Sequence, residues 1–180
     1  MNKTLYYTKF LELKTTSTKN GNAWIYAHRP NAKDVVVILP TTEDEVLFLI
    51  EERPPMQAEN KGKYTIGLAA GLVGDERIGE STEDAIRSEL LEETGLAASN
   101  ITIKTRNTAS SAGCVSETFT VAIAEIEDKS EKQKPVTDGG IIVDRVWVKK
   151  NDVRKWLMQK EQEGYILTAQ MLTALFYLFE

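Results

Sequence analysis

Apolar residues along the chain gather in short runs of β-branched and aromatic types, which favour the strands of a sheet. Residues 34–39, DVVVIL, form an almost continuous apolar run, as expected of a strand buried on both faces. A second apolar run follows at residues 46–52, and the polar turn between the two runs predicts a hairpin. Further strands are predicted at residues 101–106, 118–126 and 141–149.

The N-terminal segment repeats this pattern. Residues 5–14 and 22–28 carry strand-forming types on either side of a polar turn at residues 15–21, so they predict an N-terminal β-hairpin. Trp24 lies on the second strand and allows two interpretations. It is either a core or interface aromatic, or a platform on which a nucleobase stacks.

Three stretches have the apolar period and the end signals of helices. The first can be capped by Ser81 or Thr82, and Gly95 supplies its stop. The second runs from an Asn or Asp cap through residues 151–162. Thr168 can cap the last helix, on which four apolar residues predict a stripe that packs on the sheet. They are Leu172, Leu175, Phe176 and Phe179.

The first helix carries three carboxylates at positions i, i+3 and i+4, namely Glu89, Glu92 and Glu93. At about 100° per residue this spacing puts them on one side of the helix. Three anions so close repel one another unless a cation stands among them, and Mg²⁺ prefers oxygen ligands and phosphates. The pattern indicates either a magnesium site that handles a phosphate or a solvated acidic face. The sequence before the helix predicts a small-residue loop, in which a backbone carbonyl at Ala70 could approach the same metal closely.

The glutamates belong to a longer pattern. Gly74 is followed after five residues by Glu80 and, after seven more, by SELLEETGL at residues 88–96. This spacing resembles the Nudix box, G-x5-E-x7-R-E-U-x-E-E-x-G-U, in which U is aliphatic. One fixed position differs, because Ser88 stands where the family has Arg.

This resemblance assigns a role to each carboxylate. It implies that Glu89, Glu92 and Glu93 hold a catalytic Mg²⁺ or Mn²⁺, that Glu93 is central to catalysis, and that Glu80 supports the site. The box arginine of the family helps to orient these glutamates, so Ser88 leaves the level of activity open.

A narrower resemblance joins the chain to ADP-ribose and nucleotide-sugar pyrophosphatases. The segment VLFLIEERPP is similar to their strand before the box, which implies that Arg53 contacts the substrate. The entry to the box keeps the Ala-Gly of their E-x-P-A-G pattern but lacks its Glu and Pro. The loop at residues 108–117 resembles their S-P-G-loop-E segment with Ala112 replacing Pro, and Glu117 would complete the metal site or act as the base.

Length, net charge and cysteine content limit the classes of partner and the cellular location that we expect. The 180 residues are 42% hydrophobic, which suffices for one domain with an added arm. A net charge of −5 argues against nucleic acid or a membrane surface as the partner. Small phosphorylated substrates remain compatible with this charge, because a bound cation would make the local charge of the site positive. The single cysteine excludes an internal disulfide, and no apolar leader begins the chain. We expect a cytoplasmic protein.

The elements predict an α+β (α/β) fold, and the resemblance implies an α/β/α sandwich around a mixed sheet. Residues 34–180 would form this Nudix hydrolase domain. The hairpin within residues 1–33 resembles the dimerisation arm of ADP-ribose pyrophosphatases, so we expect a homodimer.

The expected activity is magnesium-dependent hydrolysis of the diphosphate linkage in a nucleoside diphosphate joined to another group. ADP-ribose or a nucleotide sugar is the favoured substrate, giving a nucleoside monophosphate and a sugar phosphate. Ser88 leaves open a catalytically weak or inactive nucleotide sensor. An isoprenoid-diphosphate isomerase of the same fold is a further alternative, which needs a cysteine and a glutamate across one cleft, but Cys114 has no supporting sequence context.

Overall fold

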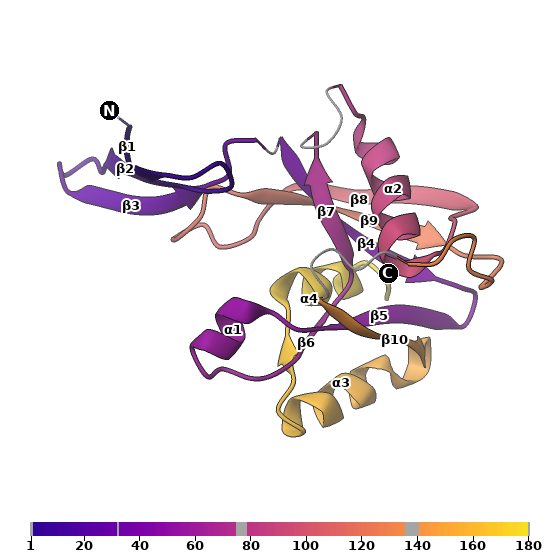
Figure 1. The fold of residues 1–180 in the computed structure, drawn as a ribbon. Coiled ribbons are helices and arrows are strands. Elements are labelled where there is room, and N and C mark those ends of the chain that lie inside the picture. Colours follow the sequence, from indigo (N-terminus) through magenta and orange to yellow (C-terminus); the bar gives the residue numbers. More distant parts are fainter. Residues whose placement is uncertain (1, 32, 75–78, 136–140, 180) are drawn as a thin grey trace.

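The computed structural model describes residues 2–31, 33–74, 79–135 and 141–179. A three-stranded antiparallel sheet at the N-terminus projects from an eight-stranded mixed sheet (Figure 1). The small sheet consists of β1 (Lys3–Tyr7), β2 (Glu12–Ser17) and β3 (Ala23–His28), in that order. The N-terminal segment therefore forms an arm, which we define as residues 2–31 within the predicted boundary of residues 1–33.

The main sheet is mixed because two of its pairings are parallel. Its strand order is β11-β6-β5-β4-β9-β8, with β10 paired to β5 and β7 paired to β4. The pairs β4–β9 and β11–β6 are parallel, and the others are antiparallel. The strands are β4 (Asp34–Thr41), β5 (Glu45–Glu51), β6 (Thr65–Gly67), β7 (Ala69–Val73), β8 (Asn100–Ala109), β9 (Thr118–Glu125), β10 (Ile142–Lys149) and β11 (Ile166–Leu167).

Helices cover both faces of this sheet (Figure 1). On one face, Ile86 and Leu90 of α2 (Thr82–Thr94) pack against apolar residues of the sheet. On the other face, α3 (Val153–Gln162) and α4 (Ala169–Phe176) contribute Leu157 and Met171 to a second core. A short helix, α1 (Pro54–Ala58), follows β5. The predicted α/β/α sandwich around a mixed sheet is confirmed.

The signals at the ends of α2 act as predicted. The Ser81 hydroxyl accepts a hydrogen bond from the Asp84 amide at 3.1 Å and so caps the first turn. Gly95 ends the helix in the left-handed region, with φ of 75°. The glutamates between these ends therefore have a fixed helical phase.

The arm differs from the predicted hairpin in having three strands. Residues 5–14 do not form one strand, because a turn closed by Thr8 separates β1 from β2. The Thr8 hydroxyl accepts a hydrogen bond from the Leu11 amide at 2.9 Å and donates one to the Leu11 carbonyl at 2.9 Å. Strand β2 then continues into the predicted turn at residues 15–21. The signal for this turn that sequence reasoning missed was Thr8, a polar residue within the strand-like run of residues 5–14.

Three local expectations about the main domain were wrong. The small residues near Ala70 form strand β7 rather than a loop, because they pair with β4. The side chain of Asp152 makes no capping hydrogen bond, since a 3₁₀ turn (Lys150–Asp152) precedes α3. The core face of α4 is Met171, Ala174 and Leu175, so only Leu175 of the predicted stripe is buried. Leu172, Phe176 and Phe179 of that stripe are exposed.

Candidate functional site

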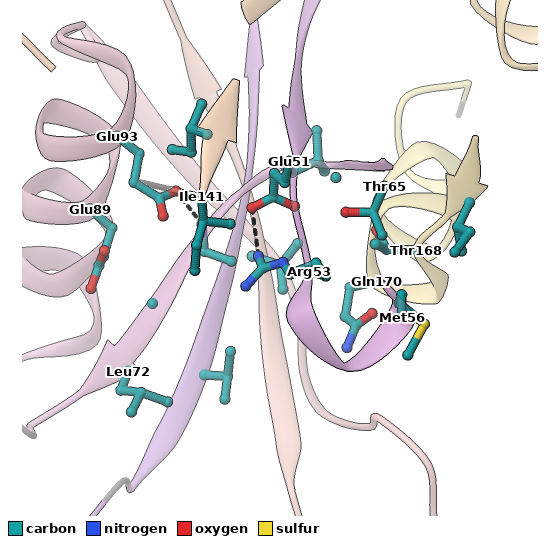
Figure 2. Close-up of a pocket in the computed structure, with 18 of the residues that line it drawn as sticks. Glu51, Arg53, Met56, Thr65, Leu72, Glu89, Glu93, Ile141, Thr168 and Gln170 are labelled. Carbon is teal, nitrogen blue, oxygen red and sulfur yellow. Dashed lines mark hydrogen bonds and ion pairs between the residues drawn. The ribbon is translucent and has the colours of Figure 1, made fainter. Parts of the chain in front are cut away.

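A cavity of about 900 Å³ opens beside the main sheet. The carboxylates of α2 line one end, and residues of β5, β6, β7 and the start of α4 are among those that line the other parts. Figure 2 shows Glu89 and Glu93 on the side of α2 that faces Glu51 and Arg53, with the Glu93 carboxylate directed toward them. The predicted residues Glu89, Glu92, Glu93, Arg53, Ala70 and Glu117 all line this cavity.

Glu93 is the most perturbed of these carboxylates. Its Oε2 accepts a hydrogen bond from the Ala70 amide at 3.0 Å, so β7 holds the carboxyl in place. Burial raises the pKa of Glu93 to about 8, the Ala70 hydrogen bond opposes that rise, and the charges of Glu89 and Glu51 add to it. Burial therefore disfavours the charged form of Glu93 in the metal-free protein, and the neighbouring carboxylates disfavour it further.

The position of the Glu89 carboxylate depends on the absence of a side chain at Gly71 of β7. A Cβ built on Gly71 would lie 1.8 Å from Glu89 Oε1 and 2.5 Å from Oε2. A side chain at this position would therefore occupy the space of the Glu89 carboxylate. The close approach in the structure is that of the Glu89 carboxylate to Gly71, and the predicted approach of the Ala70 carbonyl to a metal stays a prediction.

These carboxylates fit a magnesium ion in donor type and charge. Among the described residues, no three acidic, histidine or cysteine side chains converge into a complete metal cage. Mg²⁺ does not require one, because it commonly takes one or two carboxylates and completes its shell with water and phosphate oxygens. A divalent cation at this end would also oppose the effects of burial and of neighbouring carboxylates, which together raise the pKa of Glu93. The fit is thus to an ion that shares its ligands with a phosphate.

Glu51 is a site residue that sequence reasoning missed. It lies at the end of β5, 2% exposed, and its Oε1 accepts from Arg53 Nη2 at 2.5 Å. Burial raises the pKa of Glu51, and the charge and hydrogen bond of Arg53 oppose that rise. The available signal was a carboxylate that directly follows the apolar run at residues 46–50, because a charge at the end of a buried strand needs a partner. Glu51 also fixes the guanidinium of Arg53 at the cavity.

Glu117 is held by a second arginine that was not predicted. Arg29 Nε donates to Glu117 Oε2 at 2.6 Å, and the Ser110 hydroxyl donates to Glu117 Oε1 at 3.1 Å. The loop before Glu117 is fastened to the arm, because the Ala27 amide donates to the Cys114 carbonyl at 2.8 Å. Arg29 and Glu117 both line the cavity. The arm therefore positions the loop that carries Glu117.

Two predicted residues lie outside the cavity lining. The indole of Trp24 is half exposed and donates to the carbonyl of Gly113 at 2.9 Å, beside the loop that carries Glu117. Glu80 Oε2 accepts from the Gly74 amide at 3.3 Å and so joins the two ends of the segment between them. Residues 75–78 of the box lie outside the described residues.

A further arginine, which the sequence did not indicate, contacts the last turn of α2. Arg145 on β10 donates through Nε to the Glu93 carbonyl at 2.6 Å. The last turn of α2 carries no basic residue of its own, so Arg145 supplies the positive charge that the helix dipole favours there. Its Nη2 is buried and has no hydrogen-bond partner among the described residues.

Comparisons with known proteins agree with this site. The family model described as NUDIX domain matches residues 30–169. A solved structure, "Crystal structure of ADP compounds hydrolase", aligns with a TM-score of 0.74 at 18% identity, covering 99% of this chain and 89% of that chain. Comparison with curated proteins finds no match. Among the described residues, no helix is long and apolar enough to cross a membrane.

Proposed function

The chain belongs to the NUDIX domain family of hydrolases, and we propose that it cleaves the diphosphate linkage of a nucleoside diphosphate joined to another group, most simply ADP-ribose or a nucleotide sugar. One observation carries this proposal. The carboxylates of α2 face an arginine, Arg53, across a single cavity. A metal held on one side and a guanidinium on the other are the groups that a diphosphate requires. The solved structure that resembles the chain is titled as a hydrolase of ADP compounds, which agrees with this substrate class.

In the proposed reaction, Glu89, Glu92 and Glu93 would hold Mg²⁺ or Mn²⁺. The ion would neutralise the diphosphate and lower the pKa of bound water. Arg53, oriented by Glu51, binds the phosphate oxygens.

Glu117 orients the attacking water or takes its proton, with Arg29 and Ser110 fixing its carboxylate. The water oxygen forms a bond to one phosphorus, and the bridging oxygen leaves with the other phosphate. The products are a nucleoside monophosphate and a sugar phosphate.

Two alternative functions, a nucleotide sensor and an isoprenoid-diphosphate isomerase, differ in how well the site supports them. Ser88 in place of the box arginine favours a sensor that binds the same compounds without hydrolysing them. An isoprenoid-diphosphate isomerase would need a cysteine in the cavity. Cys114 is exposed and lies outside the lining, which argues against that activity.

We further propose that residues 34–180 form the Nudix domain and that the N-terminal segment of residues 1–33, which contains the arm, joins two copies of the chain in a homodimer. Strand β1 is exposed along its whole length, and Tyr6 and Phe10 are 67% and 69% exposed. Apolar surface of this extent is typical of an interface. In such a homodimer, Trp24 would stack on the nucleobase at the edge of a site. The single unpaired Cys114 supports a cytoplasmic location.

A turnover screen tests the proposed activity. ADP-ribose, other nucleotide sugars, dinucleotides and nucleoside triphosphates are incubated with Mg²⁺ or Mn²⁺, and the products are separated by chromatography. We expect AMP plus a sugar phosphate, and no product from the Glu93→Gln variant. Metal-dependent binding without product from any compound would replace the proposed reaction with the sensor alternative.

A further inference from the structure

The cavity continues beyond Glu51 to an end that the diphosphate chemistry does not use. Figure 2 shows Thr65, Thr168 and Gln170 on the side of Glu51 and Arg53 away from Glu89 and Glu93. All three line the same cavity as the carboxylates of α2. They come from β6 and from the start of α4, so they are fixed by the sheet and by the helix cap.

Thr65 has an unusual environment. It is 3% exposed, and its Oγ1 forms no hydrogen bond of normal geometry with any described residue, although it lies close enough to Glu51 to help hold the pKa of that carboxyl down. An unsatisfied buried hydroxyl costs about 1–3 kcal/mol of stability. Because Thr65 lines the cavity and its hydroxyl points toward Glu51 (Figure 2), a ligand hydroxyl bound beside Glu51 can supply the missing partner.

Glu51 presents its second oxygen to the same region. Oε1 is taken by Arg53, whereas Oε2 lies 2.6 Å from where a Cβ on Gly67 would stand. The absence of a side chain at Gly67 thus leaves room for the carboxyl at this end. The Thr168 hydroxyl borders the same space, but it donates to the Ile66 carbonyl at 3.2 Å and caps α4 by accepting from the Met171 amide at 3.4 Å.

The residues at this end of the cavity disfavour the binding of a phosphate or of the nucleobase there. A further phosphate is disfavoured, because Arg53, which Figure 2 shows beside this end, is already used for the diphosphate in the proposed reaction. A nucleobase is disfavoured, because no described lining residue is aromatic. Hydroxyl and amide groups from Thr65 and Gln170, with Met56 as an apolar wall, match the hydroxyl groups and the ring face of a sugar.

We propose that Thr65, Glu51 and Gln170 form a hydroxyl-binding subsite that recognises the sugar linked to the diphosphate. The proposal rests on the proposed function, because it names which part of that substrate lies at this end. The subsite makes the enzyme selective for nucleotide sugars over nucleoside diphosphates that carry an apolar group. A site built to hydrogen-bond a hydroxyl rejects a ligand that lacks one, since its own buried polar groups then stay unpaired.

The test compares Thr65→Val with Thr41→Val on two compounds, ADP-ribose and a pentyl ester of ADP that has no hydroxyl beyond the diphosphate. Valine keeps the shape of threonine, and Thr41 is likewise buried in a strand but lies outside the cavity lining. We expect Thr65→Val to lower kcat/KM for ADP-ribose about tenfold, the loss of one well-placed hydrogen bond. Hydrolysis of the pentyl ester by Thr65→Val, and of both compounds by Thr41→Val, should stay within about twofold of wild type.

Stability and binding give independent readouts. Thr65→Val should unfold at the same temperature as wild type or higher, because it removes an unpaired buried hydroxyl. Equal loss of both activities, or no loss of either, would overturn the subsite.

If wild type hydrolyses neither compound, calorimetric binding of both in the presence of Mg²⁺ decides. Weaker binding of ADP-ribose alone to Thr65→Val would keep the subsite and reject the proposed reaction. The absence of binding to wild type would reject both.

Discussion

Glu93→Gln should remove most of a pH dependence that is built into the metal-free protein. Burial raises the pKa of Glu93 to about 8 from an ordinary value of 4.5. Between these two values the folded chain keeps a proton on Glu93 that the unfolded chain has lost. The free energy of unfolding contributed by this group is therefore highest below pH 4.5, and it falls as the pH rises toward 8.

The size of the effect follows from the pKa difference. A difference of 1 in pKa between the folded and unfolded chain corresponds to about 1.4 kcal/mol, so the full difference sets an upper bound of roughly 5 kcal/mol. Rotation of the carboxyl toward water reduces this figure, and we expect a fall of at least about 2 kcal/mol between pH 5 and pH 8.5. The glutamine side chain can still accept the hydrogen bond of the Ala70 amide and carries no charge.

The assay is urea unfolding in EDTA at pH 5, 7 and 8.5, with Glu83→Gln as the control. Glu83 lies on the same helix but is exposed and paired with Arg87. Wild type and Glu83→Gln should lose stability in parallel as the pH rises, whereas Glu93→Gln should lose at least about 2 kcal/mol less. At pH 8.5, saturating Mg²⁺ should restore wild type more than Glu93→Gln. Parallel curves for all three proteins would refute the buried, perturbed state of Glu93.

Two further substitutions test the supports of this helix. Gly71→Ala should lower kcat/KM about 100-fold with little change in stability, because its Cβ takes the place of the carboxylate at the end of the Glu89 side chain; melting curves beside turnover assays check both. Arg145→Met should lower the free energy of unfolding by about 1–2 kcal/mol, since it removes the donor to the Glu93 carbonyl. Arg154→Met, an exposed control on α3, should change it little in the same urea titration.

Local signals in the sequence predicted the elements that frame the site. Strand types, the Ser81 cap and the Gly95 stop fixed α2 and the shared face of its glutamates, because these depend on neighbours a few residues apart. The same reasoning misplaced the core face of α4. Its apolar residues surround much of the short helix, so periodicity alone could not decide between Leu172 and Met171, and packing against the sheet decided it.

The groups that sequence reasoning missed act over long separations. Arg29 meets Glu117 across 88 residues, and Arg145 meets Glu93 across 52. Each pair exists because strands that are distant in the chain lie together in the fold. Glu51 and Arg53 are only two residues apart, yet their role depends on burial, which sets how strongly the carboxyl is perturbed. Pair geometry of this kind follows from topology rather than from composition or spacing.

Arg145 also bears on the meaning of Ser88. In the Nudix box, an arginine within the helix orients the glutamates. Its replacement by Ser88 left open that the protein is a catalytically weak or inactive nucleotide sensor. Here β10 brings a guanidinium to the carbonyl of Glu93, and β7 holds the carboxyl of the same residue through the Ala70 amide. Both the carbonyl and the carboxyl of Glu93 are therefore fixed by strands of the main sheet. A helix held in this way does not need its own arginine to keep Glu93 in place, so Ser88 alone is a weak argument for loss of activity.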